Sequence, residues 1–363
     1  MTLERTERIA RDGMLRGLHP GVQLYVSLAG RSHELKLGDA RPGVPVAADT
    51  LMLWLSSIKP IAAVAIAKLW EQGLLGLDDR VALHIPEFAA NGKEAVTLRH
   101  VLTHTGGFRM PIRHWRGQTW DEAIAEVCKG RLEPRWVPGE KAGYHPASSW
   151  YLLGELIRRI DGRPFEEYVR DEIFTPLGMA DWSIGIAYDK QQALGDRLCT
   201  MFDTSSGEPA VDPALNSPHF IAAVRPGANG RGPAAQFARF YEMLLGGGEL
   251  GGARILRPST VAEFVRRQRA GMYDHTFKHT LDYGLGFIVD SKQYGAATIP
   301  YGYGDHASPA TFGHGGSQSS VAFADPEHGL VVALAFNGMP GEASHQERLR
   351  LTASAIYEDL GLA

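Results

Sequence analysis

Residues 58–72 predict a helix that is apolar on nearly every side. A surface helix carries a polar face, so a helix without one has to be buried. The glycine at position 73 ends the pattern. The chain must therefore fold around this helix, with other elements covering it from several directions. The apolar positions are Ile61, Ala62, Val64, Ala65, Ile66, Leu69 and Trp70.

Strand-like runs occur near both ends of the chain, and helical patterns fill the middle. Strands are expected at 21–28, 32–37, 285–289, 321–324 and 330–337. Amphipathic helices are expected at 5–17 and 344–360, and further helices at 97–102, 120–127, 148–160, 165–174 and 233–245. This order predicts a sheet built from both chain ends, with a helical insertion between them.

The composition excludes several classes of partner. The chain has 363 residues and a net charge of −4, which gives no reason to expect nucleic acid or an anionic membrane as partner. Residues 1–17 mix charged and isolated apolar side chains and lack the apolar core of a secretory signal. No run approaches the length of a membrane span. We therefore expect a cytoplasmic protein, and the sequence gives no indication of its oligomeric state.

A Ser-x-x-Lys motif, Ser56-Ser57-Ile58-Lys59, opens the apolar helix. Its serine and lysine lie one helical turn apart, and the helix N-terminus favours negative charge that develops on the serine. Burial lowers the pKa of a lysine and leaves a neutral amine, which is a general base beside a nucleophile. On the tetrapeptide alone, a capping serine and a surface lysine would be the preferred interpretation. The position of the motif, the only Ser-x-x-Lys in the chain, favours catalysis.

Two further segments carry candidate chemistry. Tyr144 lies on a loop before the helix at 148–160, where it is either a core residue or, as a phenolate near a lysine, a proton shuttle. Residues 312–317, with the sequence Phe-Gly-His-Gly-Gly-Ser, come just before an expected strand. Glycines there allow a ligand to approach the backbone, and an N–H can complete an oxyanion hole. The alternative is an ordinary glycine-rich turn.

These three elements, in this order, resemble the Ser-x-x-Lys, Tyr-x-Asn and Lys/His-x-Gly motifs of the serine β-lactamase and penicillin-binding-protein superfamily. That superfamily includes class C β-lactamases, DD-peptidases and family VIII-type esterases. The stretches 100–107, 150–157, 176–179 and 283–286 extend the resemblance over nearly the whole chain. It implies a β-lactamase/transpeptidase-like fold, with an antiparallel sheet flanked by helices. An α/β lobe of residues 1–80 and 256–363 would face a mainly helical lobe of residues 81–255, with the active site between them.

The resemblance also implies a role for each matching residue. Ser56 would be the acylated nucleophile, Lys59 its base and Tyr144 the proton shuttle toward the leaving group. The N–H groups of Ser56 and Ser317 would form the oxyanion hole. No metal and no cofactor is implied. The strand motif itself would comprise His314, Gly315 and Gly316.

The sequence departs from the family pattern at Pro146, which replaces the usual Asn and lacks a donor for the amide arm of a lactam. His145 either takes over part of this polar role or is a turn residue that faces solvent. His314, in place of lysine, resembles the esterase branch. Loop aromatics predict an apolar wall for the substrate, with ordinary loop packing as the alternative. The pocket candidates are His145, Phe108, Trp115 and Tyr303, and the other aromatics are Tyr273, Phe277 and Tyr301.

Two other patterns carry little weight. His100 and His104 have helical i, i+4 spacing, but the glutamate of a His-Glu-x-x-His motif and a third ligand are lacking, so a structural role is preferred. The chain has no Gly-x-Ser-x-Gly motif, which argues against an α/β-hydrolase.

The sequence thus predicts a carboxylesterase that forms an acyl-enzyme on Ser56 with a small or medium ester. The alternatives are an acyltransferase (transesterase) and a peptide or amide hydrolase or cyclase of the same fold. A β-lactamase, a DD-peptidase or a non-catalytic binding protein is less favoured.

Overall fold

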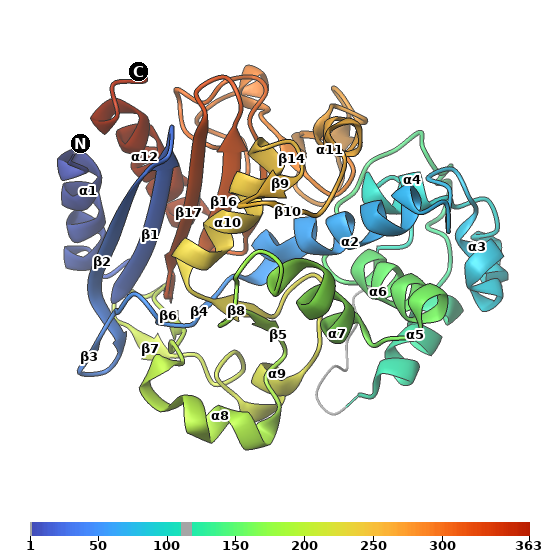
Figure 1. The fold of residues 1–363 in the computed structure, drawn as a ribbon, viewed down its shortest axis with the longest axis horizontal. Coiled ribbons are helices and arrows are strands. Elements are labelled where there is room, and N and C mark those ends of the chain that lie inside the picture. Colours follow the sequence, from blue (N-terminus) through green and yellow to red (C-terminus); the bar gives the residue numbers. More distant parts are fainter. Residues whose placement is uncertain (1, 110–117) are drawn as a thin grey trace.

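The computed structural model describes residues 2–109 and 118–363, and its centre is one antiparallel sheet (Figure 1). The first strand of the chain pairs with the last long one, since Val22 lies opposite Phe336. The prediction of a sheet built from both chain ends is therefore confirmed. In spatial order the strands are β13 (Asp282–Tyr283), β14 (Ile288–Val289), β15 (Phe312–Gly316), β16 (Ser320–Asp325), β17 (Leu330–Phe336), β1 (Gly21–Leu28), β2 (Arg31–Arg41) and β3 (Val44–Pro45).

Strand β17 shows why the sheet needs helices on both sides. Successive side chains of a strand point to opposite faces, and every residue of β17 is buried. Val332 and Leu334 pack into the cluster that includes α12 (Glu342–Asp359) and α1 (Glu4–Leu15). Ala333 and Ala335 face α10 (Ala234–Leu245) and α2 (Lys59–Glu71) on the other side.

Helix α2 is buried, as its apolar pattern predicts. Residues 59–67 of this helix are all buried, and α2 contacts α6 (Ser148–Asp161), α7 (Phe165–Val169) and α11 (Pro258–Val265). Figure 1 shows α2 running from the sheet into the helical half of the molecule. Its N-terminal end therefore lies where the two halves meet. The other helices are α3 (Val81–His84), α4 (Leu98–Leu102), α5 (Trp120–Lys129), α8 (Tyr188–Leu194) and α9 (Pro218–Ala222).

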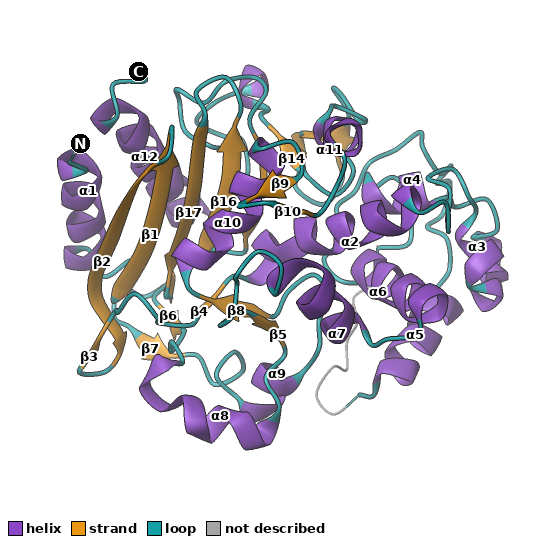
Figure 2. Cartoon of the chain, in the orientation of Figure 1, coloured by secondary structure: helices purple, strands orange, loops and turns teal. Residues whose placement is uncertain are grey.

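Short strands complete the fold. One group of three, β4 (Met52–Leu53), β5 (Ser183–Ile184) and β8 (Gly230–Gly232), includes the strand that comes directly before the Ser-x-x-Lys motif. Strand β8 pairs with both β4 and β5. Figure 2 shows the long strands on one side of the molecule and α3–α7 on the other. The remaining strands are β6 (Phe202–Asp203), β7 (Ala210–Val211), β9 (Glu249–Leu250), β10 (Ala253–Arg254), β11 (Tyr273–Asp274), β12 (His279–Thr280) and β18 (Gly338–Met339).

The structure corrects three element predictions. Residues 312–316 do not precede a strand but form one, β15, because β14 and β16 supply its hydrogen-bond partners despite the weak strand propensity of glycine. The strand expected at 285–289 shrinks to β14, since Gly286 has a φ of +83°. The helix expected at 165–174 is α7 followed by a π-helical turn, Arg170–Phe174.

Helix α10 packs on the sheet although it lies within residues 81–255, the predicted helical lobe.

In the described part of the chain, no helix is long and apolar enough to cross a membrane.

Candidate active site

Ser56 lies in a 3₁₀ turn, Leu55–Ile58, that joins β4 to α2. Leu55, just before it, has a φ of 43°, a conformation that is unfavourable for leucine and is held here by the surrounding structure. Ser56 is half-buried and reaches a cavity, whereas Ser57 is fully buried with its hydroxyl oxygen 3.0 Å from that of Ser320. The strained turn therefore presents Ser56 to the cavity and buries Ser57.

Lys59 is completely buried beneath Ser56. Its Nζ lies 2.8 Å from Ser56 Oγ, and it donates to the carbonyl oxygens of Gly227 at 2.7 Å and Pro146 at 3.1 Å. Burial lowers the pKa of Lys59 well below its ordinary value. A neutral amine has two N–H groups and one lone pair. In its neutral form, the amine can donate its two N–H groups to these carbonyls and accept from the Ser56 hydroxyl with its lone pair.

Tyr144 lies close to both Lys59 and Ser56, and it lines the same cavity as Ser56. The Lys59 Nζ is 5.2 Å from the centre of its ring. Burial raises the pKa of Tyr144 far more than a hydrogen bond with Ser56 lowers it. With its pKa raised, Tyr144 is a neutral phenol in the free site, and not the phenolate that a neighbouring lysine suggested.

A buried ion pair that sequence reasoning missed positions Tyr144. Asp274 Oδ1 accepts from the backbone N–H groups of Tyr144 at 3.0 Å, Thr276 at 2.9 Å and Phe277 at 3.0 Å. Its Oδ2 lies 3.1 Å from Arg269, and both side chains are buried. An aspartate that binds the N–H two residues further on is a common turn signal, and Asp274-His-Thr276 carried it.

The two histidines beside Tyr144 face the interior. His145 is fully buried, its Nδ1 lies 2.5 Å from Ser149 Oγ, and its N–H donates to His104 Nδ1 at 3.1 Å. Burial, with a contribution from nearby arginines, lowers the pKa of His145 to about 3. Both roles considered for His145, a polar contact to the substrate and a turn facing solvent, are therefore wrong. The other histidine of the i, i+4 pair, His100, accepts a hydrogen bond from the Thr97 N–H at the start of α4. Among the described residues, no cluster of three potential metal ligands occurs.

Strand β15 brings its glycines against the serine turn. A Cβ on Gly316 would lie 2.4 Å from the Trp54 carbonyl oxygen, so a larger residue would push the strand away. His314 of the same strand is buried, with Nδ1 2.7 Å from the Gly315 oxygen, and burial together with Lys59 lowers its pKa to about 3. In the described part of the chain, the N–H groups of Ser56 and Ser317 have no hydrogen-bond acceptor.

A cavity of about 420 Å³ lies over Ser56, a size suited to a small molecule. Phe277 and Tyr301 line it, as two of the expected wall aromatics. Its lining is Ser56, Tyr144, Pro146, Thr276, Phe277, Pro300, Tyr301, Gly315, Ser317, Glu342 and Gln346.

The other aromatic candidates lie elsewhere. Phe108 packs between Phe88 and His145 in the core, and the Tyr303 hydroxyl donates to a backbone carbonyl of β14, so neither reaches the cavity. Tyr273 is half exposed at the surface. Trp115 lies outside the described residues. Pattern alone could not separate core aromatics from wall aromatics.

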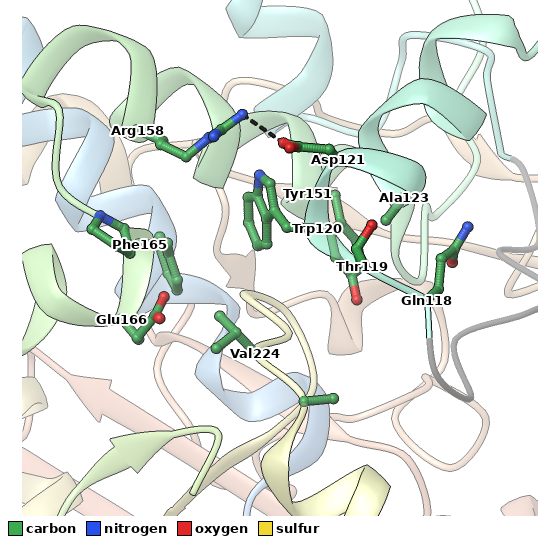
Figure 3. Close-up of a pocket in the computed structure, with 12 residues that line it drawn as sticks. Gln118, Thr119, Trp120, Asp121, Ala123, Tyr151, Arg158, Phe165, Glu166 and Val224 are labelled. Atoms are coloured by element: carbon green, nitrogen blue, oxygen red, sulfur yellow. Dashed lines mark hydrogen bonds and ion pairs between the residues drawn. The ribbon is translucent and has the colours of Figure 1, made fainter. Parts of the chain in front are cut away.

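A second cavity, of about 480 Å³, lies in the helical half (Figure 3). Trp120, Tyr151, Phe165 and Val224 supply its apolar wall, and at its rim Arg158 donates to Asp121 at 2.9 Å. Its described lining contains no serine or cysteine, so the chemistry of the Ser56 cavity is not repeated there.

Known proteins resemble this chain over most of its length. The Beta-lactamase family model matches residues 6–357. The chain is 28% identical to Esterase/beta-lactamase LipL of Mycobacterium tuberculosis, covering 81% of this chain and 71% of that protein. It is 29% identical to Esterase EstB of Burkholderia gladioli, covering 84% and 83%. A penicillin-binding-protein homologue from Caulobacter crescentus superposes with a TM-score of 0.80 at 28% identity, covering 98% and 97%.

The fold, the serine–lysine–tyrosine geometry and these matches agree. The antiparallel sheet flanked by helices is the β-lactamase/transpeptidase-like fold of that solved relative. The chain therefore belongs to the Beta-lactamase family and is a serine hydrolase of this fold.

Proposed function

We propose that the protein is a carboxylesterase that forms an acyl-enzyme on Ser56 with a small or medium acyl group. The observation that carries the proposal is the buried Lys59 amine, whose nitrogen lies 2.8 Å from the Ser56 hydroxyl oxygen and within hydrogen-bond distance of two backbone carbonyls. That arrangement makes Ser56 a nucleophile at neutral pH.

In acylation, Ser56 Oγ attacks the ester carbonyl carbon and its proton passes to Lys59 Nζ. The negative oxygen is stabilised by the N–H groups of Ser56 and Ser317. The bond to the alkoxide then breaks, the Tyr144 hydroxyl gives its proton to the alkoxide, and Lys59 returns a proton to Tyr144. In deacylation, water attacks the acyl carbon, loses a proton to the same groups, and Ser56 regains its proton as the acid leaves.

Pro146 favours esters over lactams and peptides as substrates. It faces the cavity, and its carbonyl accepts from Lys59, but its side chain offers no donor to an acylamino arm. An alkoxide is also a better leaving group than an amine, so less proton transfer is needed as the bond breaks. The names of the two relatives described above, LipL and EstB, include the word esterase, which supports the same choice.

Steady-state kinetics on p-nitrophenyl butyrate and nitrocefin test the proposal. We expect kcat/KM for the ester to exceed that for the lactam by orders of magnitude, with both activities lost in Ser56→Ala. Pro146→Asn should then change the ester activity little. Comparable turnover of the two compounds would contradict the proposal.

A further inference from the structure

Glu342 is the one charged residue among the described residues that line the Ser56 cavity. It is the first residue of α12. Its carboxylate accepts from the Tyr301 hydroxyl at 3.0 Å and from the Ser317 hydroxyl at 3.3 Å. These two donors hold a negative charge at the edge of the cavity, beside the residue whose N–H belongs to the proposed oxyanion hole.

A row of aromatic ring contacts, through Phe277 and Tyr301, links Tyr144 to the Glu342 carboxylate. The Phe277 ring lies 4.6 Å from that of Tyr144 and, edge to face, 5.8 Å from that of Tyr301. The faces of aromatic rings attract cations, and quaternary ammonium groups bind where several rings surround them. A carboxylate at the end of such a wall adds a direct charge attraction.

The basic groups near the cavity do not cancel this negative charge. Lys59 and His314 are fully buried and do not line the cavity, and burial lowers the pKa of both groups. Arg109 donates to Thr276 of the wall at 3.0 Å, but its charge is paired with Glu133. Among the described residues, Glu342 is therefore the charged side chain that an entering substrate meets in the cavity lining.

We propose that the site prefers esters whose alcohol part carries an ammonium group, with Glu342 as the residue that determines this specificity. The inference rests on the proposed esterase function. The alcohol part is assigned because Tyr144, which protonates the leaving alkoxide, belongs to the same aromatic wall as Phe277 and Tyr301. The negative charge of Glu342 also disfavours anionic substrates, including penicillins and cephalosporins, which carry a carboxylate.

Two isosteric esters test the inference. Butyrylcholine and 3,3-dimethylbutyl butyrate differ in carrying nitrogen or carbon at one position, and acid release in a pH-stat measures both. The ratio of their kcat/KM values is compared between the wild type and Glu342→Gln, so that differences in leaving-group chemistry cancel. The glutamine keeps acceptors for Tyr301 and Ser317. We expect the ratio to fall about fivefold or more, the effect of one charge at about 4 Å in water.

A matched control and a second measurement keep the test decisive. Glu347→Gln removes a charge from an exposed position of the same helix and should leave the ratio unchanged. In the wild type, the ratio should also fall as ionic strength rises from about 0.01 M to about 1 M, which shortens the Debye length from about 30 Å to about 3 Å. That measurement needs no variant.

The outcomes separate the two proposals. An unchanged ratio in Glu342→Gln, an equal fall in Glu347→Gln, or a ratio independent of salt would overturn the role of Glu342 while both esters are still hydrolysed. If neither ester is hydrolysed, or if hydrolysis persists in Ser56→Ala, the esterase proposal itself fails.

Discussion

At the level of single residues, the surroundings of Ser56 and Lys59 come from segments far apart in the sequence. The carbonyls that accept from Lys59 come from Pro146, 87 residues away, and Gly227, 168 residues away. Helix α2 buries the amine, and these two carbonyls orient it. Neither burial nor orientation alone would aim a lone pair at the serine.

The pH dependence of acylation follows from the buried lysine. Because burial lowers the pKa of Lys59 well below 10.5, kcat/KM should be lost only as pH falls through this lowered value, where the amine gains a proton. Pre-steady-state acylation rates measured against pH check this. An acid limb centred near the ordinary lysine pKa would show that Lys59 is not the base.

Lys59 and Tyr144 should behave as one unit. Lys59→Met and Tyr144→Phe should each lower kcat by several orders of magnitude, and the double variant should be little worse than either, because residues that share one proton path are not additive. A full double-mutant cycle on p-nitrophenyl butyrate measures this. Additive losses, or an active Tyr144→Phe enzyme, would separate the two roles.

The buried pair behind Tyr144 gives a stability prediction. Asp274→Ala leaves Arg269 without its counter-charge and should destabilise the fold by about 3–5 kcal/mol in denaturant unfolding. Asp78→Ala is the control, because its bond to Arg99 joins side chains that are 73% and 29% exposed, and such pairs contribute about 1 kcal/mol at most. Equal losses in the two variants would refute the role of the buried pair.

Sequence reasoning singled out Ser56, Lys59 and Tyr144, which the structure brings together, but not the groups that position them. A Ser-x-x-Lys motif opening an apolar helix is visible because both residue types and their spacing are unusual. The carbonyls of Pro146 and Gly227 are not visible, because every residue has one. Asp274 was readable as a turn residue, yet nothing local linked it to Tyr144, 130 residues away.

At the scale of elements, strand β15 and the serine turn fit together because glycines allow the contact. A Cβ on Gly315 would lie 2.2 Å from the Tyr301 ring, and one on Gly316 would lie 2.3 Å from Ser320 Oγ as well as against the Trp54 carbonyl. At Gly315 the obstacle is the Tyr301 side chain, whereas at Gly316 it includes the backbone carbonyl of Trp54.

This difference predicts which glycine substitution can be rescued. Gly315→Ala should cost about 1–3 kcal/mol of unfolding free energy, as overpacking does, and Tyr301→Ala in the same chain should recover part of that cost. Gly316→Ala should cost at least as much, and Ser320→Ala should not rescue it, because the Trp54 carbonyl remains. Urea unfolding of the four variants decides. Rescue of Gly316→Ala by Ser320→Ala would contradict the proposed backbone contact.

Element types were predictable where the apolar pattern was clear, either as an unbroken run, as in α2 and β17, or as one apolar face, as in α1. Strand β15 was not, because three of its five residues are glycine and its pairing comes from neighbours distant in sequence. The sequence does not show whether an aromatic side chain on a loop points into the core or into the cavity. Phe108, in the core, and Phe277, in the cavity wall, could therefore not be distinguished.

At the scale of the whole molecule, the two chain ends close one face of the sheet together. The Thr6 hydroxyl of α1 donates to Asp359 of α12 at 2.8 Å. Further along, Asp325 at the end of β16 accepts from the Tyr357 hydroxyl of α12 at 2.8 Å and from the Ser308 hydroxyl at 2.6 Å. A single buried carboxylate thus joins the sheet, a long loop and the last helix.

Asp325 should make the fold sensitive to acid. Burial favours a raised pKa, but hydrogen bonds from Ser308, His328 and Tyr357 outweigh it and lower the pKa to about 2. A lowered carboxyl pKa stabilises the fold above the ordinary value near 3.8, and this stability is lost as pH falls toward about 2. Asp325→Asn should therefore be less stable at neutral pH and flatten the stability curve across that window. An unchanged slope would contradict this assignment.

The general arrangement was predictable, since strands at both chain ends leave few ways to build a sheet. The place of α10 was not, because an amphipathic helix in the middle of the chain can cover either the sheet or other helices. Its packing against β1 and β17 depends on the small residues Ala333 and Ala335, which alternate with larger ones on the opposite face.

Covalent labelling is the most direct test of whether Ser56 is the nucleophile. A fluorophosphonate should add one label per chain, and peptide mapping by mass spectrometry should place it on Ser56, with no label and no ester turnover in Ser56→Ala. Buried Ser57 and cavity-facing Ser317 are internal controls within the same chain. A label on either of them, or one that persists in Ser56→Ala, would show that Ser56 is not the nucleophile.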